Sequence, residues 1–186
     1  MTTPSTNRPP EPWDSFLRGL DAAVDTVTRM DCIGGFVITQ FYGLDRATSD
    51  VDVIELAPPS AASTILTLGY RGSALSRVHR IYLDRVAVAS IPEDYEDRLV
   101  EMFPGAYRHL RLMAVDPYDL ALSKLERNGM KDRDDVRYLA RTVPFDLGIL
   151  QQRYDKELRW QLGVPAREDL TLKLWIEAIL EDRAEG

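Results

Sequence analysis

The chain has 186 residues, of which 45% are hydrophobic and 28% are charged, and its formal net charge at pH 7 is -7. A chain of roughly 100–200 residues fits one domain, or one compact core with an appendage. The composition excludes the disordered, collagen-like and disulfide-rich classes. The acidity argues against a polyanionic partner, although the middle third, residues 71–141, is close to neutral and is the best place for a nucleic-acid surface.

The first twelve residues, MTTPSTNRPPEP, contain neither a signal-peptide core nor an amphipathic targeting helix, and no apolar run approaches the roughly 20 residues that a membrane helix needs. We therefore expect residues 1–12 to form a flexible tail of a cytoplasmic protein without a membrane partner. From Trp13 to Met30, apolar residues recur at spacings of three and four. This spacing predicts one long amphipathic helix.

The next segments predict a strand, a glycine turn and a helix, followed by a second strand. Cys32 and Ile33 are apolar, Gly34-Gly35 breaks the run, and residues 36–42 have helical spacing. Residues 50–56 alternate with period two and predict a strand, and a helix capped by Ser60 is expected over 61–68. Residues 79–91 are rich in β-branched and aromatic residues and hold either one long strand or two short strands.

The rest of the chain predicts one further strand and several helices. A helix is expected over 92–102, a strand over 110–115, and a helix from Pro117 to about Gly129 with Asp116 as its N-cap. Further helices are expected over 131–141, 146–162 and 167–182. The predicted fold class is α/β in the α+β sense, with a small mixed β-sheet flanked by helices over 13–115 and a C-terminal helical bundle over 116–186.

Two acids share one face of the strand predicted over 50–56. Asp50 and Asp52 stand at i and i+2, about 7 Å apart along the backbone, and can share one or two divalent cations such as Mg²⁺. Cations held in this way bridge phosphate oxygens and neutralise charge during phosphoryl transfer. A lone Asp-x-Asp is more often a pair of solvated acids, so its neighbours decide the interpretation.

Those neighbours favour a phosphate-binding site. Gly34 and Gly35 stand between a predicted strand and a predicted helix, where glycines let backbone N–H groups approach phosphate oxygens. The approach to the two acids carries one cation and two hydroxyls, from Arg46, Thr48 and Ser49. Together with the acids, this grouping is hard to explain as solvation alone.

The run GGFVITQFYGLDRATSDVDV resembles the DNA polymerase β-like nucleotidyltransferase superfamily, whose signature is a Gly-Gly or Gly-Ser turn followed by Asp-hydrophobic-Asp on a strand. It looks closest to the AbiEii and MenT-type toxins of toxin–antitoxin systems, which also show Arg-x-Thr/Ser-x-Asp-x-Asp. That branch has, further on, a helix with a lysine followed by Arg/Lys-Asp-x-x-Asp. Here LALSKLERNGMKDRDDVRYL supplies Lys124 and the run 131–135, so the resemblance covers residues 30 to 142.

The resemblance implies a Mg²⁺-dependent enzyme that transfers NMP from an NTP to the 3′ end of tRNA and has a cognate antitoxin as partner. It implies metal binding by Asp50 and Asp52, with Asp84 as a third catalytic carboxylate, unless residues 79–91 form a hairpin and Asp84 lies in its turn. The nucleotide-binding residues would be Gly34, Gly35, Arg46, Thr48, Ser49 and Lys124.

The lysine region leaves two readings for each residue. Lys124 can reach a triphosphate, or its stem can be buried while its ammonium reaches water. Asp132 and Asp135, at i and i+3, share a helix face and would orient Lys124 as further catalytic residues, or Asp132 caps its helix.

Two other functions keep the same site. One is nucleotide transfer to a small molecule, as in antibiotic nucleotidyltransferases, which the acidity of the chain favours. The other is a catalytically silent NTP-binding module, against which the presence of both Asp50 and Asp52 argues.

Overall fold

The computed structural model describes residues 7–87 and 90–185, and it divides into two compact units. One unit comprises residues 1–88 and 99–114, and the other comprises 89–98 and 115–186. Of the tail expected over 1–12, residues 1–6 lie outside the described residues. In the remainder, Pro9 is buried and the Asn7 side-chain amide donates a hydrogen bond to the Pro104 carbonyl.

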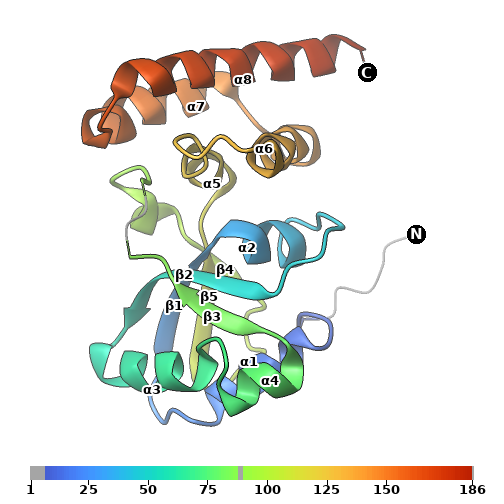
Figure 1. Ribbon diagram of the computed structural model, residues 1–186, viewed down its shortest axis with the longest axis vertical. Helices are drawn as coiled ribbons and strands as arrows, with labels where there is room; N and C mark the ends of the chain where they lie inside the picture. Colours follow the sequence, from blue (N-terminus) through green and yellow to red (C-terminus); the bar gives the residue numbers. More distant parts are fainter. Residues whose placement is uncertain (1–6, 88–89, 186) are drawn as a thin grey trace. The chain divides into compact units, whose positions relative to one another are not determined.

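The first unit is built on a five-stranded mixed sheet (Figure 1). The strands are β1 (Thr28–Ile33), β2 (Asp50–Ala57), β3 (Tyr82–Arg85), β4 (Val100–Met102) and β5 (Leu110–Ala114), in the order β3-β2-β1-β5-β4. β1 is antiparallel to β2 and parallel to β5, β2 is parallel to β3, and β4 is antiparallel to β5. This mixed sheet confirms the predicted fold class.

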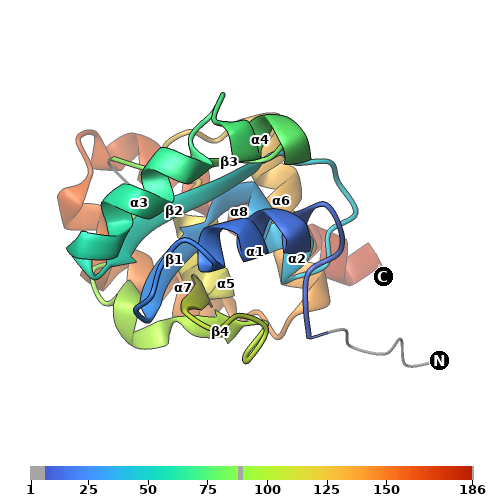
Figure 2. The same cartoon turned by 90° about the horizontal axis from the view of Figure 1, so that it is seen from below.

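Helices cover both faces of this sheet. α1 (Trp13–Asp21), α3 (Pro59–Gly69) and α4 (Ala74–His79) lie on one face, and the short α2 (Gly34–Gln40) lies on the other (Figures 1 and 2). The alternation predicted for β2 is present, since Val51 and Val53 are fully buried between β2 and the helices of the first face.

Two of the predicted helices are wrong. The helix expected from Trp13 to Met30 ends at Asp21, whose carboxylate accepts the backbone N–H groups of residues 108, 109 and 110 at the start of β5. Its last residues instead enter β1, where pairing with two strands replaces the helical ladder. The helix expected over 92–102 is a 3-10 turn, Tyr95–Arg98, followed by β4, because β4 gains a ladder with β5.

Smaller differences concern helix starts near the sheet edge. The helix expected over 61–68 begins at Pro59 and has Pro58, not Ser60, at its N-cap. Helix α4 is absent from the sequence predictions, and it begins after Ser73, whose hydroxyl accepts the Ser76 N–H. Residues 79–91 contain the single strand β3 among their described residues, which puts Asp84 within a strand rather than in a hairpin turn.

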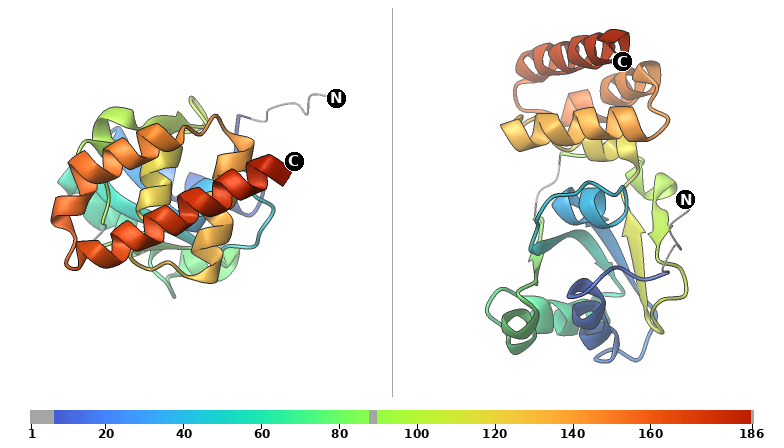
Figure 3. Two further views of the ribbon diagram at one scale, coloured as in Figure 1. Left: turned by 90° about the horizontal axis from the view of Figure 1, so that it is seen from above. Right: turned by 90° about the vertical axis from the view of Figure 1, so that its right-hand side faces the viewer.

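The second unit is helical, with α5 (Pro117–Leu122), α6 (Met130–Thr142), α7 (Leu147–Arg153) and the long α8 (Pro165–Glu185), which crosses α6 (Figure 3). Asp116 caps α5 as predicted, since its side chain accepts two backbone N–H groups. α5 ends at Leu122 rather than near Gly129, so Lys124 lies in the turns that follow it. The helix expected over 146–162 continues beyond α7 as a π-helical turn, Tyr154–Leu158, and a 3-10 turn, Arg159–Gln161.

A buried carboxylate ties residues 89–98 to the helices of the second unit. Asp119 is fully buried and accepts hydrogen bonds from Arg98 at 2.8 Å and from Arg153 at 2.9 Å. Leaving either cation out would bury uncompensated charge, so the chain segment that carries Arg98 belongs with α5 and α7. Across residues 7–87 and 90–185, no helix is long and apolar enough to cross a membrane.

Candidate active site

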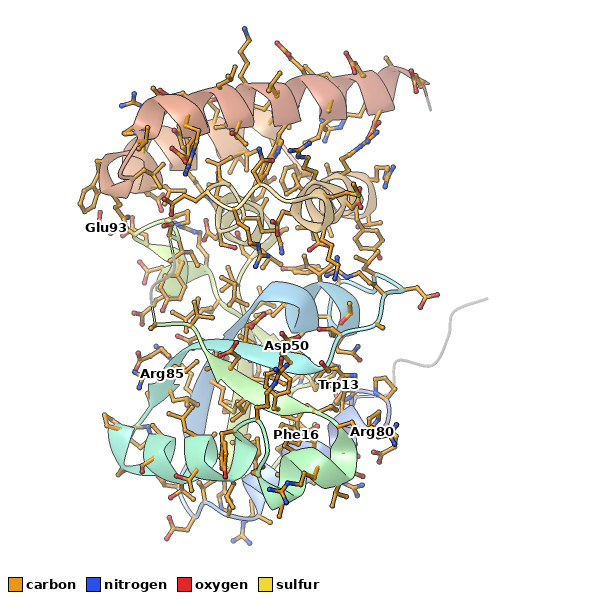
Figure 4. The ribbon with its side chains drawn as sticks, in the orientation of Figure 1. Trp13, Phe16, Asp50, Arg80, Arg85 and Glu93 are labelled. Carbon is orange, nitrogen blue, oxygen red and sulfur yellow. The ribbon has the colours of Figure 1, made fainter. Side chains whose placement is uncertain are left out.

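Strand register gathers the three predicted carboxylates on one face of the sheet. Asp50 pairs with Tyr82, and Asp52 pairs with Asp84, across the parallel β2–β3 ladder. Partners in register project to the same face, so these four residues form one surface, here called the acid face. Figure 4 labels Asp50 on this face. The alternate residues point to the opposite, buried face: Val51, Val53 and Leu83.

The residue at position 34 must be glycine because the Asp52 carboxylate occupies the space that a side chain would need. It has a φ of +73°, and a Cβ at this residue would lie 2.9 Å from the Asp52 Cγ and would overlap its Oδ2. The two residues meet because β1 pairs Ile33 with Asp52. The absent side chain therefore gives the Asp52 carboxylate its place beside the first turn of α2.

The segment that leads into β2 packs over the second glycine. A Cβ on Gly35 would lie 3.0 Å from the Thr48 Oγ1 and 3.6 Å from the Arg46 Nη2. The Thr48 hydroxyl donates a 2.7 Å hydrogen bond to the Asp50 carboxylate. Ser49 is exposed, and its carbonyl accepts the Tyr82 N–H, so it begins the β2–β3 pairing. The residues predicted to bind nucleotide in this unit thus border the acids.

The acid face fits a hard divalent cation by its donor chemistry. Among the described residues, no three His, Cys, Asp or Glu side chains are gathered closely enough to hold a metal ion by themselves. Mg²⁺ in phosphoryl-transfer enzymes is commonly held by one or two carboxylates together with substrate phosphates and water. Asp50 and Asp52, both partly exposed, match that demand, and the absence of a Cβ at Gly34 leaves room for the Asp52 carboxylate.

Lys124 and its predicted partners form a buried cluster in the second unit. The Lys124 Nζ lies 2.9 Å from Asp135 and 3.7 Å from Asp132, and the lysine side chain is only 3% exposed. Its ammonium is therefore held by carboxylates and does not extend into water. Asp132 also accepts the Gly129 N–H and a hydrogen bond from Arg127, so it both faces Lys124 and caps α6.

The charge state of Asp132 follows from these contacts. Burial alone would raise the pKa of Asp132, but the hydrogen bonds from the Arg127 guanidinium and the Gly129 N–H hold it below its usual value. Asp132 is therefore ionised at neutral pH and keeps a negative charge near the Lys124 ammonium.

Lys124→Met is expected to lower the free energy of unfolding by about 3–5 kcal/mol, because it removes the ammonium that faces two buried carboxylates. Urea unfolding followed by circular dichroism measures this loss. The double variant Lys124→Met/Asp135→Leu should recover most of it, because an apolar pair replaces the ion pair. A double variant no more stable than Lys124→Met alone would contradict this account.

Two residues lie beside the acids that the sequence predictions did not place there. Tyr82 pairs with Asp50, and Arg71, in the turn after α3, donates a 2.7 Å hydrogen bond to the Tyr82 hydroxyl. The i, i+2 spacing of Tyr82 and Asp84 could have placed the tyrosine on the acid face once residues 82–85 were assigned to a strand. Arg71 stands among the arginines of residues 71–141, where a nucleic-acid surface was expected, but no local pattern indicated its contact with Tyr82 across the sheet edge.

Comparison with known proteins gives one family match. The model of the family DUF6036, nucleotidyltransferases of unknown function, matches residues 14–176. None of the curated proteins and none of the solved structures matches the chain significantly. The matched region includes every candidate site residue of both units.

Proposed function

This chain belongs to the DUF6036 family of nucleotidyltransferases, and from that premise we propose that the acid face is the centre that transfers NMP from an NTP to a hydroxyl acceptor. The observation that carries the proposal is the pairing of Asp52 with Asp84 beside Asp50, which puts three carboxylates on one face. Gly34, which leaves room for the Asp52 carboxylate, supports it.

The carboxylates have different tasks in this proposal. Asp50 and Asp52 would hold Mg²⁺, which would supply positive charge to offset the charge that develops on the triphosphate oxygens. Thr48 keeps the Asp50 carboxylate oriented through its 2.7 Å hydrogen bond. Asp84 is exposed at the edge strand and is available to an acceptor hydroxyl.

The transfer step then balances in a single displacement. The acceptor oxygen forms a bond to the α-phosphorus of the NTP, and its proton passes to the Asp84 carboxylate. The bond between the α-phosphorus and the oxygen that bridges to the β-phosphate breaks. Pyrophosphate leaves, and the acceptor carries the new phosphodiester. The residues proposed to contact the nucleotide are those that border the acids: Gly34, Gly35, Arg46 and Ser49.

For the acceptor, we propose the 3′ end of tRNA, with a cognate antitoxin protein as the partner that controls the activity. The support is the resemblance of the Arg46 to Asp52 run, and of the lysine region, to toxins of the AbiEii and MenT type. Transfer to the 3′ end would block aminoacylation, which is the type of activity that requires an antitoxin.

Lys124 is proposed to have a role in the reaction, with Asp132 and Asp135 fixing its position. The support is its ion pairs, which hold the ammonium in one place. The stability-restored variant Lys124→Met/Asp135→Leu separates the two roles. If it folds normally and still fails to transfer, the lysine has a role in the reaction. If it transfers at the wild-type rate, Lys124 serves only the fold.

One assay tests the function as a whole. The protein is incubated with each α-labelled NTP, Mg²⁺ and total RNA, and the products are separated on denaturing gels and by thin-layer chromatography. Label is expected in a tRNA-sized band with one NTP preferred, and not with the Asp50→Asn variant. Label found only in small molecules would replace the RNA acceptor with a small one, and no labelled product with any NTP would overturn the transferase assignment for this chain.

A further inference from the structure

An arginine and a tyrosine at the sheet edge form a pair that the transfer step does not use. Tyr82 lies on the acid face of β3, which is the edge strand of the sheet (Figure 1). The Arg71 guanidinium carbon lies 4.3 Å from the centre of the Tyr82 ring, and its Nη2 donates a 2.7 Å hydrogen bond to the Tyr82 hydroxyl. Arg71 is exposed, and Tyr82 is half-buried.

Backbone pairing explains how Arg71 reaches the acid face. Tyr70 forms an isolated parallel bridge with Leu83, so the chain that leaves α3 runs along the outer side of β3. Leu83 points to the buried face, and Arg71 follows Tyr70 as the first residue of a turn. The contacts of the Arg71 guanidinium with the Tyr82 ring and hydroxyl bring it to the acid face. Moving outward from β2, the acid face thus presents a row: Asp50 and Asp52, then Tyr82 and Asp84, then Arg71 against Tyr82.

The direction of this row determines which substrate meets the cation. If Asp50 and Asp52 hold the metal and the triphosphate, and Asp84 accepts the proton of the attacking hydroxyl, the acceptor must lie on the β3 side. Tyr82 lies on that side, two residues before Asp84 on β3, and Arg71 contacts its ring and hydroxyl. The triphosphate, held by the acids of β2, is one strand further away.

We propose that Arg71 and Tyr82 form the acceptor subsite and bind the terminal nucleotides of a single-stranded RNA 3′ end. A guanidinium plane supported by an aromatic ring stacks on nucleobases and also binds phosphate, and aromatic and arginine stacking is the usual means of holding unpaired RNA bases. This inference rests on the proposed transferase function and assigns its acceptor side. It also gives an acidic chain, whose net charge is -7, one cation at the place where RNA would bind.

The same strand supplies a matched control. Arg85 pairs with Val53, whose side chain is fully buried on the opposite face, and it lines a pocket of about 410 Å³ with residues of α3. Arg71 and Arg85 thus carry the same charge near the same edge strand but serve different faces. Figure 4 labels Asp50 and Arg85. Asp50 pairs with Tyr82 at one end of the β2–β3 ladder, and Arg85 pairs with Val53 at the other.

The test compares Arg71→Gln, Tyr82→Leu, Tyr82→Phe and Arg85→Gln in the full chain. Fluorescence anisotropy measures binding of a labelled single-stranded RNA whose 3′ end is blocked, and steady-state assays measure KM for RNA and for NTP separately. Arg71→Gln and Tyr82→Leu are each expected to weaken RNA binding and raise the RNA KM about tenfold, as for the loss of one stacked base. Tyr82→Phe, which keeps the ring, should change both by less than about threefold.

Two further readouts separate this role from a structural one. The NTP KM and Mn²⁺ affinity should stay at wild-type values in Arg71→Gln, and the slope of log affinity against log salt should fall by about one for the lost phosphate contact. Arg85→Gln should match wild type throughout. If Arg71→Gln and Tyr82→Leu bind RNA as tightly as Arg85→Gln does, the assignment of the acceptor subsite is wrong, while the proposed transferase function is unaffected. If no NTP is transferred at all, the proposed function fails, and the anisotropy data still decide whether this edge binds RNA.

Discussion

Asp52→Asn is expected to lower kcat/KM for nucleotide transfer by at least about a hundredfold, which corresponds to about 2.7 kcal/mol of transition-state stabilisation. The amide keeps the size of the carboxylate but removes the charge that a divalent cation requires. The carboxylate is partly exposed and lies beside Gly34. The free energy of unfolding should therefore change by less than about 1 kcal/mol.

Metal binding is measured independently of turnover. Electron paramagnetic resonance with Mn²⁺ should show weakened binding in Asp52→Asn, and urea unfolding should show an unchanged fold. Glu55→Gln provides the matched control, because Glu55 pairs with Asp31 further along β2, away from Asp84. Near-normal turnover of Asp52→Asn at saturating Mg²⁺, or equal Mn²⁺ loss in both variants, would remove Asp52 from the metal site.

Gly34→Ala is expected to abolish transfer almost as fully as Asp52→Asn does, although it removes no functional group. The new Cβ would overlap the Asp52 Oδ2, so the carboxylate must turn away from its position on the acid face. The φ of +73° adds backbone strain, and we expect the free energy of unfolding to fall by about 1–3 kcal/mol. Transfer rate, Mn²⁺ affinity and urea unfolding are measured together.

A second glycine separates the strain from the overlap. Gly105 has a nearly identical φ of +75°, but its Cβ would meet no atom closer than 3.9 Å. Gly105→Ala should therefore lose similar stability and keep its transfer rate. If both alanine variants transferred nucleotide equally well, the close approach of Gly34 to Asp52 would have no part in the activity.

The acids of the site differ in how far they could be predicted. Asp50 and Asp52 stand two residues apart within an alternating run, so their common face follows from strand geometry alone. The position of Asp84 depended on whether residues 79–91 fold back as a hairpin or pair with an earlier strand. Its neighbour Asp52 is 32 positions earlier in the chain, and no local pattern encodes that pairing.

The lysine region shows the same division. The i, i+3 spacing of Asp132 and Asp135 predicted a common helix face, and both acids do lie near the Lys124 ammonium. The end of α5 at Leu122 was not predicted, because the turns after it depend on how the buried lysine meets α6. The reading in which Lys124 reaches water is excluded by its 3% exposure.

By itself, the sequence determined the features that depend on neighbours a few residues apart: the glycine turn, the alternation of β2 and the Asp116 cap of α5. Only the tertiary structure decided the end of α1, the conversion of 92–102 into a 3-10 turn and β4, and the meeting of Asp84 and Arg71 beside β2. Each of these depends on hydrogen bonds between segments far apart in the chain, and the free energy of such pairing outweighs the local preference that the sequence pattern records.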